Sequence, residues 1–174
     1  MILLLIRHGK AEEGAGKADA DRVLTEDGRK ECRQFFRALH AYVGQLSHII
    51  SSPLVRAQET ADILAEFSPT AMRAQSEELS PWSDPAELNF LLRQLVENHK
   101  LSGGASSQTY CALVSHEPYL SQTTSYLLTG ETRPILEVRK GGVSILEYQG
   151  PTWGGGFCLQ AHLFPKFYRS LVSR

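Results

Sequence analysis

Cysteines are few in this sequence and long apolar runs are missing, and both absences exclude whole classes of protein. The three cysteines among 174 residues are odd in number and widely spaced, so neither a disulfide framework nor a zinc site is indicated. The longest early apolar run, residues 2–6, is too short to span a bilayer, and it lacks the basic flank of a secretory signal. We therefore expect a protein of a reducing compartment, the cytoplasm, with no attachment to a membrane.

An excess of charge of one sign is also missing. Eighteen lysines and arginines stand against 19 aspartates and glutamates, which gives a formal net charge of −1 and no general attraction to nucleic acid or anionic membranes. A charged ligand must therefore be recognised locally, by a few side chains. The length and the hydrophobic share of 42% are sufficient for a substantial core, and we predict a single domain over residues 1–174.

Short apolar strands alternate with amphipathic helices along most of the chain. Strands are predicted at residues 2–6, 48–50, within 70–79 and at 110–114, with a loop at 102–108 and a C-terminal hairpin of 143–148 and 157–163. Helices are predicted after an N-cap at Thr25, with Pro53 in a first turn, after Asp84-Pro85 and around Leu120. This alternation predicts an α/β fold of three layers, α/β/α, with a mostly parallel central sheet.

Three of the predicted strands are followed directly by basic or polar residues: LLLIRHG, HIISSPLVRAQET and CALVSHEPYLSQT. In open α/β sheets, ligands bind beyond the carboxyl ends of the strands, where helix N-termini also present free backbone N–H groups. Arg7, His8, Arg56 and His116 would all be delivered to that edge. Two arginines and two imidazoles at one edge indicate a pocket for a compact anion, and phosphate is the candidate that fits best.

The order of these motifs resembles the histidine phosphatase superfamily, also described as phosphoglycerate mutase-like. Arg7-His8-Gly9 matches the R-H-G signature that follows the first strand of that family. Further matches come in the family's order and approximate spacing: Leu24-Thr25 with Gly28, Ser52-Pro53 with Arg56-Ala57, and Ser115-His116 before Pro118. The short chain, with Glu78-Leu79-Ser80-Pro81 and Ser115-His116-Glu117-Pro118, looks most like the SixA-type phosphohistidine phosphatases.

The resemblance implies roles for these residues. His8 would be the nucleophile that forms a phosphohistidine enzyme, and Arg7, Arg56 and His116 would hold the phosphate oxygens. The attacking nitrogen of His8 must be unprotonated, so we expect its other nitrogen to donate to a backbone carbonyl near Gly9. Gly9 itself would allow close approach of the backbone to the phosphate, although a simple tight turn is the alternative reading. No metal and no cofactor are expected.

The general acid of the larger mutase-like relatives has no clear counterpart in this chain. Glu78 and Glu77 are the nearest candidates, and the alternative is that Glu78 is an exposed loop carboxylate. An alkoxide leaving group benefits from a positioned acid, whereas the imidazole of a phosphohistidine leaves more readily. A missing acid therefore favours phosphohistidine substrates. Lys10 would add positive charge at the rim of the pocket, or is a solvated surface lysine.

The sequence thus predicts a metal-independent phosphatase of SixA type. Its partner would be a phosphohistidine-bearing protein, such as a phosphotransfer domain. A small-molecule phosphomonoesterase on the same scaffold and a non-catalytic phosphate-binding module are the alternatives. The sequence predicts neither the oligomeric state nor a role for the C-terminal hairpin.

Overall fold

A six-stranded mixed sheet forms the centre of the computed structural model, which describes residues 1–14, 16, 18–101 and 109–172. The strands lie in the order β3-β2-β4-β1-β5-β6. Their bounds are β1 Ile2–Arg7, β2 His48–Ser51, β3 Met72–Gln75, β4 Tyr110–Ser115, β5 Val143–Tyr148 and β6 Phe157–Leu163. The pairings β1/β4, β2/β4 and β2/β3 are parallel, and β5 runs antiparallel to both of its neighbours. The predicted mostly parallel sheet is confirmed.

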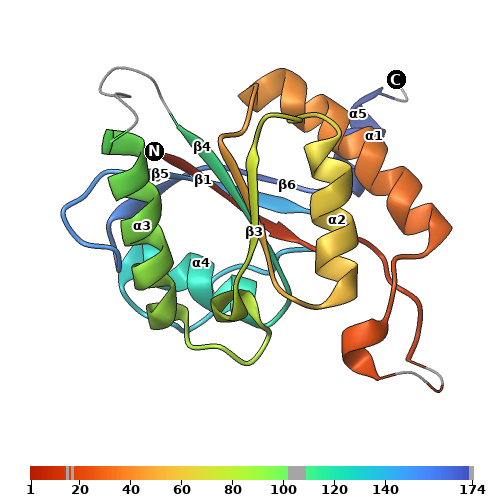
Figure 1. The fold of residues 1–174 in the computed structure, drawn as a ribbon, viewed down its shortest axis with the longest axis horizontal. Helices are drawn as coiled ribbons and strands as arrows, with labels where there is room; N and C mark the ends of the chain where they lie inside the picture. The colour runs from red at the N-terminus through yellow and green to blue at the C-terminus, as the bar shows by residue number, and fades with distance from the viewer. Residues whose placement is uncertain (15, 17, 102–108, 173–174) are drawn as a thin grey trace.

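Helices cover both faces of this sheet: α1 Glu26–Val43, α2 Val55–Ala65, α3 Leu88–Leu101 and α4 Tyr119–Thr129. Successive side chains of a strand point to opposite faces, so one apolar strand can serve two cores. In β1, Leu4 and Ile6 pack into the core shared with α1 and α2, while Leu3 and Leu5 pack into the core shared with α3 and α4. Figure 1 shows these two helical layers with the sheet between them, which confirms the three-layer prediction.

The start of α1 follows its local signal, and the start of α2 does not. Thr25 caps α1 as predicted, because its Oγ1 accepts a hydrogen bond of 3.0 Å from the N–H of Gly28. The placement of Pro53 in a first helical turn is wrong. The hydroxyl of Ser52 accepts from the N–H of Leu54, which keeps Leu54 extended, and α2 therefore begins only at Val55.

Other elements are shorter or additional. Of the segment 70–79, only Met72–Gln75 forms a strand. Its four residues are exposed because it is the edge strand of the sheet, and a 3-10 turn follows at Glu77–Leu79. Asp84 caps a 3-10 turn, Pro85–Glu87, that leads into α3. A C-terminal helix, α5 Pro165–Val172, was not predicted.

The C-terminal hairpin is confirmed, since β5 and β6 pair in antiparallel register from Val143↔Leu163 to Tyr148↔Phe157. The loop predicted at residues 102–108 lies outside the described residues. Within the described part of the chain, no helix is both long enough and apolar enough to cross a membrane.

Candidate active site

Neighbouring strand ends bring the predicted basic residues together. β4 lies between β1 and β2, and the registers pair Arg7 with Ser115 and Ser51 with Val114. The hydrogen bonding continues one residue beyond each strand: the N–H of His8 donates to the Ser115 carbonyl at 3.0 Å, and that of Ser52 to the Val114 carbonyl at 2.9 Å. The residues that follow these three parallel strands therefore meet at one edge of the sheet.

His8 is the centre of this cluster. Its ring lies 5.0 Å from the ring of His116, centroid to centroid, and both side chains are buried. Nδ1 of His8 is 2.7 Å from the carbonyl oxygen of Gly9, so Nδ1 carries the proton and donates it. The Nε–H of Arg56 donates to Nε2 of His8 at 3.3 Å. The backbone hydrogen bond expected near Gly9 is therefore present, and Nε2 is the unprotonated nitrogen, whose lone pair accepts from Arg56.

Both imidazoles are neutral at pH 7. Burial lowers the pKa of His8 to about 3; the hydrogen bond to Gly9 opposes this shift, and the charges of Arg56, Arg7 and Lys140 add to it. Burial also lowers the pKa of His116 to about 3, and repulsion between the protonated forms of the two rings and the charge of Arg56 act in the same direction. The cluster therefore takes its positive charge from the arginines and Lys140, while His8 keeps a nucleophilic electron pair.

Two buried polar atoms of the cluster have no hydrogen-bond partner among the described residues: Nε of Arg7 and Nδ1 of His116. The remaining contacts hold these side chains in place. Nη1 of Arg7 donates to the Val138 carbonyl at 2.9 Å, and Nε2 of His116 lies 2.8 Å from the hydroxyl of Ser52. Buried polar atoms are usually paired, and leaving one unpaired costs about 1–3 kcal/mol. These two atoms favour a polar ligand at the site.

Gly9 supports His8 and fits tightly against the first helix. Its carbonyl accepts from His8, and its N–H donates to Oγ1 of Thr60 at 3.0 Å, so both of its backbone polar groups are engaged within the protein. A Cβ at this position would lie 2.6 Å from Sγ of Cys32. The close approach expected at Gly9 is therefore made by helix α1, not through a free amide for phosphate.

The sequence predicted no role for two acidic residues of the site. Asp19 accepts two hydrogen bonds from the guanidinium of Arg56, one with its backbone carbonyl and one with its carboxylate. Glu117 accepts from the N–H of Val138 at 2.8 Å and so fixes the residue whose carbonyl holds Arg7. Glu117 could have been suspected because it follows His116 directly. Asp19 lies in a polar loop whose sequence carries no such pattern.

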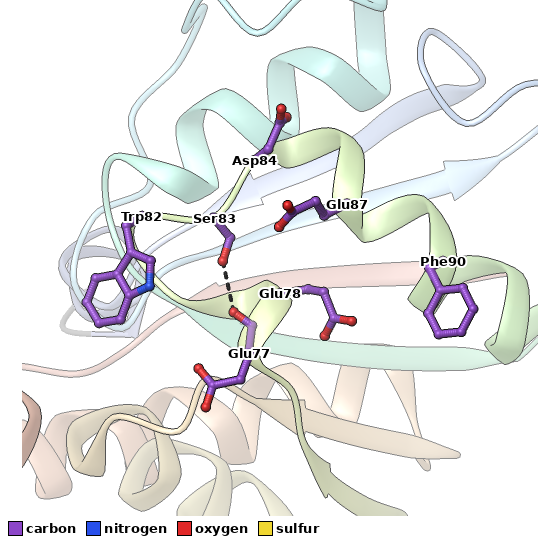
Figure 2. Close-up of a pocket in the computed structure, with 7 residues that line it drawn as sticks. All are labelled: Glu77, Glu78, Trp82, Ser83, Asp84, Glu87 and Phe90. Carbon is purple, nitrogen blue, oxygen red and sulfur yellow. Dashed lines mark hydrogen bonds between the residues drawn. The ribbon is translucent and has the colours of Figure 1, made fainter.

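Among the described residues, no hydrogen bond joins Glu78 to His8, Arg7, Arg56 or His116. The hydrogen bond that its carboxylate accepts comes from Ser76, two residues away. Glu78 lines a hollow of about 700 Å³ together with the exposed rings of Trp82 and Phe90. These side chains are drawn in Figure 2. Glu77, Asp84 and Glu87 add further carboxylates to this hollow. Lys10 is exposed, and within the described residues no group of three or more metal-ligating side chains could hold an ion.

Comparison with known proteins decides the family. The sequence model described as histidine phosphatase superfamily (branch 1) matches residues 3–82. An uncharacterized protein of Picosynechococcus is 31% identical over 165 residues, which cover 93% of this chain and 90% of that protein. The chain belongs to the histidine phosphatase superfamily. Its resemblance to the SixA phosphohistidine phosphatases holds in sequence, since the Escherichia coli SixA is 26% identical over 136 residues, or 78% of this chain and 79% of that one.

Other phosphatases are similar over shorter stretches or in fold. The serine/threonine-protein phosphatase PGAM5 of Xenopus tropicalis is 34% identical over 75 residues, but this match spans 27% of its length. A solved SixA complexed with tungstate has a TM-score of 0.79 at 21% identity, covering 97% of this chain and 99% of that one. A mycobacterial glucosyl-3-phosphoglycerate phosphatase has a TM-score of 0.71 at 19% identity, covering 92% and 97%. At such identities, the structures establish the shared fold.

Proposed function

We propose that this superfamily hydrolase removes phosphate from phosphohistidine on a signalling or phosphotransfer protein, through a covalent intermediate on His8. The observation that carries the proposal is the fixed protonation of His8. Its Nδ1 donates to the Gly9 carbonyl, which leaves the lone pair on Nε2, and the hydrogen bond that Nε2 accepts from Arg56 must break when this nitrogen attacks phosphorus. An imidazole oriented by a neighbour and surrounded by cations is what attack on phosphorus requires.

The reaction would proceed in two steps. Nε2 of His8 forms a bond to phosphorus while the bond from phosphorus to the substrate imidazole breaks, and the departing imidazole takes up a proton from solvent. Water then attacks phosphorus, the bond to Nε2 breaks, and inorganic phosphate leaves with the water oxygen. Arg7, Arg56 and His116 would stabilise the phosphoryl oxygens in both steps, and removing one such donor typically costs about 10²–10³ in rate.

The surroundings of His8 support a phosphohistidine substrate. Both hydrogen bonds of its ring go to Gly9 and Arg56, and the carboxylate of Glu78 is engaged with Ser76 on its own loop. A phosphomonoester needs a proton donor for its alkoxide, but a phosphohistidine has a better leaving group. The name of the Escherichia coli relative, phosphohistidine phosphatase SixA, supports the same choice.

A small-molecule phosphomonoesterase is the second candidate, favoured by the fold shared with glucosyl-3-phosphoglycerate phosphatase. A non-catalytic phosphate-binding module is the third candidate. It would keep the arginines and His116 but would have no use for a nucleophile held in one tautomer.

The decisive experiment traps the enzyme intermediate. Purified protein is mixed with a ³²P-phosphohistidine phosphotransfer domain and quenched in alkali, in which phosphohistidine survives. We expect labelling of the wild type and of His40→Gln, a control on α1, and no labelling of His8→Ala. A wild type that neither labels nor releases phosphate would contradict catalysis. A kcat/KM for sugar phosphates above that for the phosphohistidine protein would overturn the substrate choice. Because no step uses a metal, turnover should survive dialysis against EDTA.

A further inference from the structure

The carboxylate of Asp19 bridges two arginines at the edge of the site. Oδ2 accepts from Nη2 of Arg56 at 2.9 Å, and Oδ1 accepts from Nη1 of Arg22 at 2.8 Å. The backbone carbonyl of Asp19 accepts a further bond of 2.6 Å from Nη1 of Arg56. Arg22 is itself anchored, because its Nε and Nη2 both donate to the carbonyl of Glu12. Asp19 is thus held firmly although its side chain is 59% exposed.

This bridge determines which way the guanidinium of Arg56 faces. A guanidinium has five N–H donors in a rigid fork. Asp19 accepts one hydrogen bond from Nη1 and one from Nη2 of this guanidinium. The remaining nitrogen, Nε, donates to Nε2 of His8. The Arg56 side chain is only 6% exposed, so its orientation is set by these protein contacts and not by water.

We propose that Asp19 is a positioning residue that fixes the guanidinium of Arg56 for transfer of the phosphoryl group to His8. This inference rests on the proposed function. A flexible arginine must be ordered before it can stabilise a developing charge, and a carboxylate bound to its outer edge does this in advance. Asp19 does not touch the reacting atoms, so its effect is transmitted through Arg56.

The electrostatics of the site agree with this role. The charge of Asp19 acts to raise the pKa of His116, against the larger effect of burial, so its field reaches the cluster. The hydrogen bond from Arg22, and then that from Arg56, lowers the pKa of Asp19 itself, which keeps it ionised. Arg22 therefore serves two purposes, because it anchors the carboxylate and preserves its charge.

The chain offers a matched control two residues away. Asp19 and Asp21 lie in the same 3-10 turn, Asp19–Asp21, and both are exposed. Asn at position 19 would keep one acceptor oxygen but turn an amide NH₂ toward one of the two guanidiniums. We expect Asp19→Asn to lower kcat about 10-fold with KM changed less than about 3-fold, while Asp21→Asn stays within about 2-fold of wild type.

A double-mutant cycle with Arg56→Lys separates positioning from general support of the loop. Lysine has no fork to orient, so Asp19→Asn should cost less than about 2-fold in the Arg56→Lys background. An equal loss in both backgrounds would show that Asp19 supports the loop alone, and would overturn the inference. Asp19→Glu, which keeps the charge, should recover part of the loss.

A spectroscopic readout keeps this test separate from the proposed function. The ¹H–¹⁵N signal of the Arg56 Nε–H, assigned by its absence in Arg56→Lys, should be protected from exchange in the wild type and in Asp21→Asn. It should lose protection in Asp19→Asn. An unchanged signal in Asp19→Asn contradicts the inference even if the protein is an active phosphatase. Loss of protection supports it even if no phosphoenzyme is ever trapped.

Discussion

Arg56 donates its Nε–H to Nε2 of His8 at 3.3 Å, while the opposite nitrogen of the same ring donates to the carbonyl of Gly9. The two hydrogen bonds specify the same tautomer, with the proton on Nδ1. A second proton on the ring is disfavoured by burial and by the nearby positive charges, both of which oppose an imidazolium. The nucleophile is therefore prepared by its surroundings before any substrate arrives.

The first prediction concerns the dependence of stability on pH. The pKa of His116 is lowered from 6.5 to about 3 in the folded protein, so the unfolded chain binds the extra proton between these values. The part of the folding stability that depends on a neutral His116 is fully present above pH 6.5 and is lost as the pH falls from 6.5 toward 3. Between about pH 7.5 and about pH 5.5, the free energy of unfolding of His116→Gln should fall by about 1 kcal/mol less than that of the wild type. If chemical denaturation showed that the free energies of unfolding of the wild type and of His116→Gln fall equally over this pH range, a neutral, buried His116 would be refuted.

The second prediction tests the general acid. Glu78→Gln should leave kcat on a phosphohistidine protein within about 2-fold of wild type, because its carboxylate is engaged with Ser76 and not with the cluster. Glu77→Gln, in the same 3-10 turn, is the control for altered charge in the acidic hollow. A loss of about 10²-fold in Glu78→Gln alone would identify Glu78 as the proton donor after all.

The third prediction concerns Gly28, in the first turn of α1. Alanine is normally the better helix residue by about 1 kcal/mol. Here, however, a Cβ would lie 2.2 Å from the carbonyl oxygen of Lys10, which also accepts two hydrogen bonds from Thr25 and cannot shift freely. The clash outweighs the propensity, and Gly28→Ala should lower the free energy of unfolding by about 3 kcal/mol in urea denaturation.

Gly14→Ala is the control for that substitution, because among the described residues its Cβ would meet the Cδ of Arg22 alone, at an ordinary 3.6 Å. If Gly28→Ala and Gly14→Ala had the same free energy of unfolding, α1 would be able to move away from the Lys10 carbonyl, which would contradict the prediction.

Local patterns predicted the elements because local physics forms them. The hydroxyl of Thr25 accepts from the amide three residues later, so a short stretch of sequence predicts this cap. Alternate residues of β1 pack into two different cores, and a short apolar run predicts such a buried strand. The prediction for Pro53 was wrong because the N–H of Leu54 donates to the hydroxyl of Ser52. That hydrogen bond depends on the geometry of the turn, which the sequence does not specify. The position of β3 at the edge of the sheet was likewise not predicted, because it depends on the order of all the strands.

The sequence alone determined that Arg7, His8, Arg56 and His116 would come to one edge, because parallel strands deliver the residues after their carboxyl ends to the same place. Only the tertiary structure decided how they are held. The contacts of Asp19 with Arg56, of Glu117 with Val138, and of Gly9 with α1 join segments far apart in the chain. Such contacts leave no periodic pattern, since a single acidic or small residue is placed by the packing of whole elements around it.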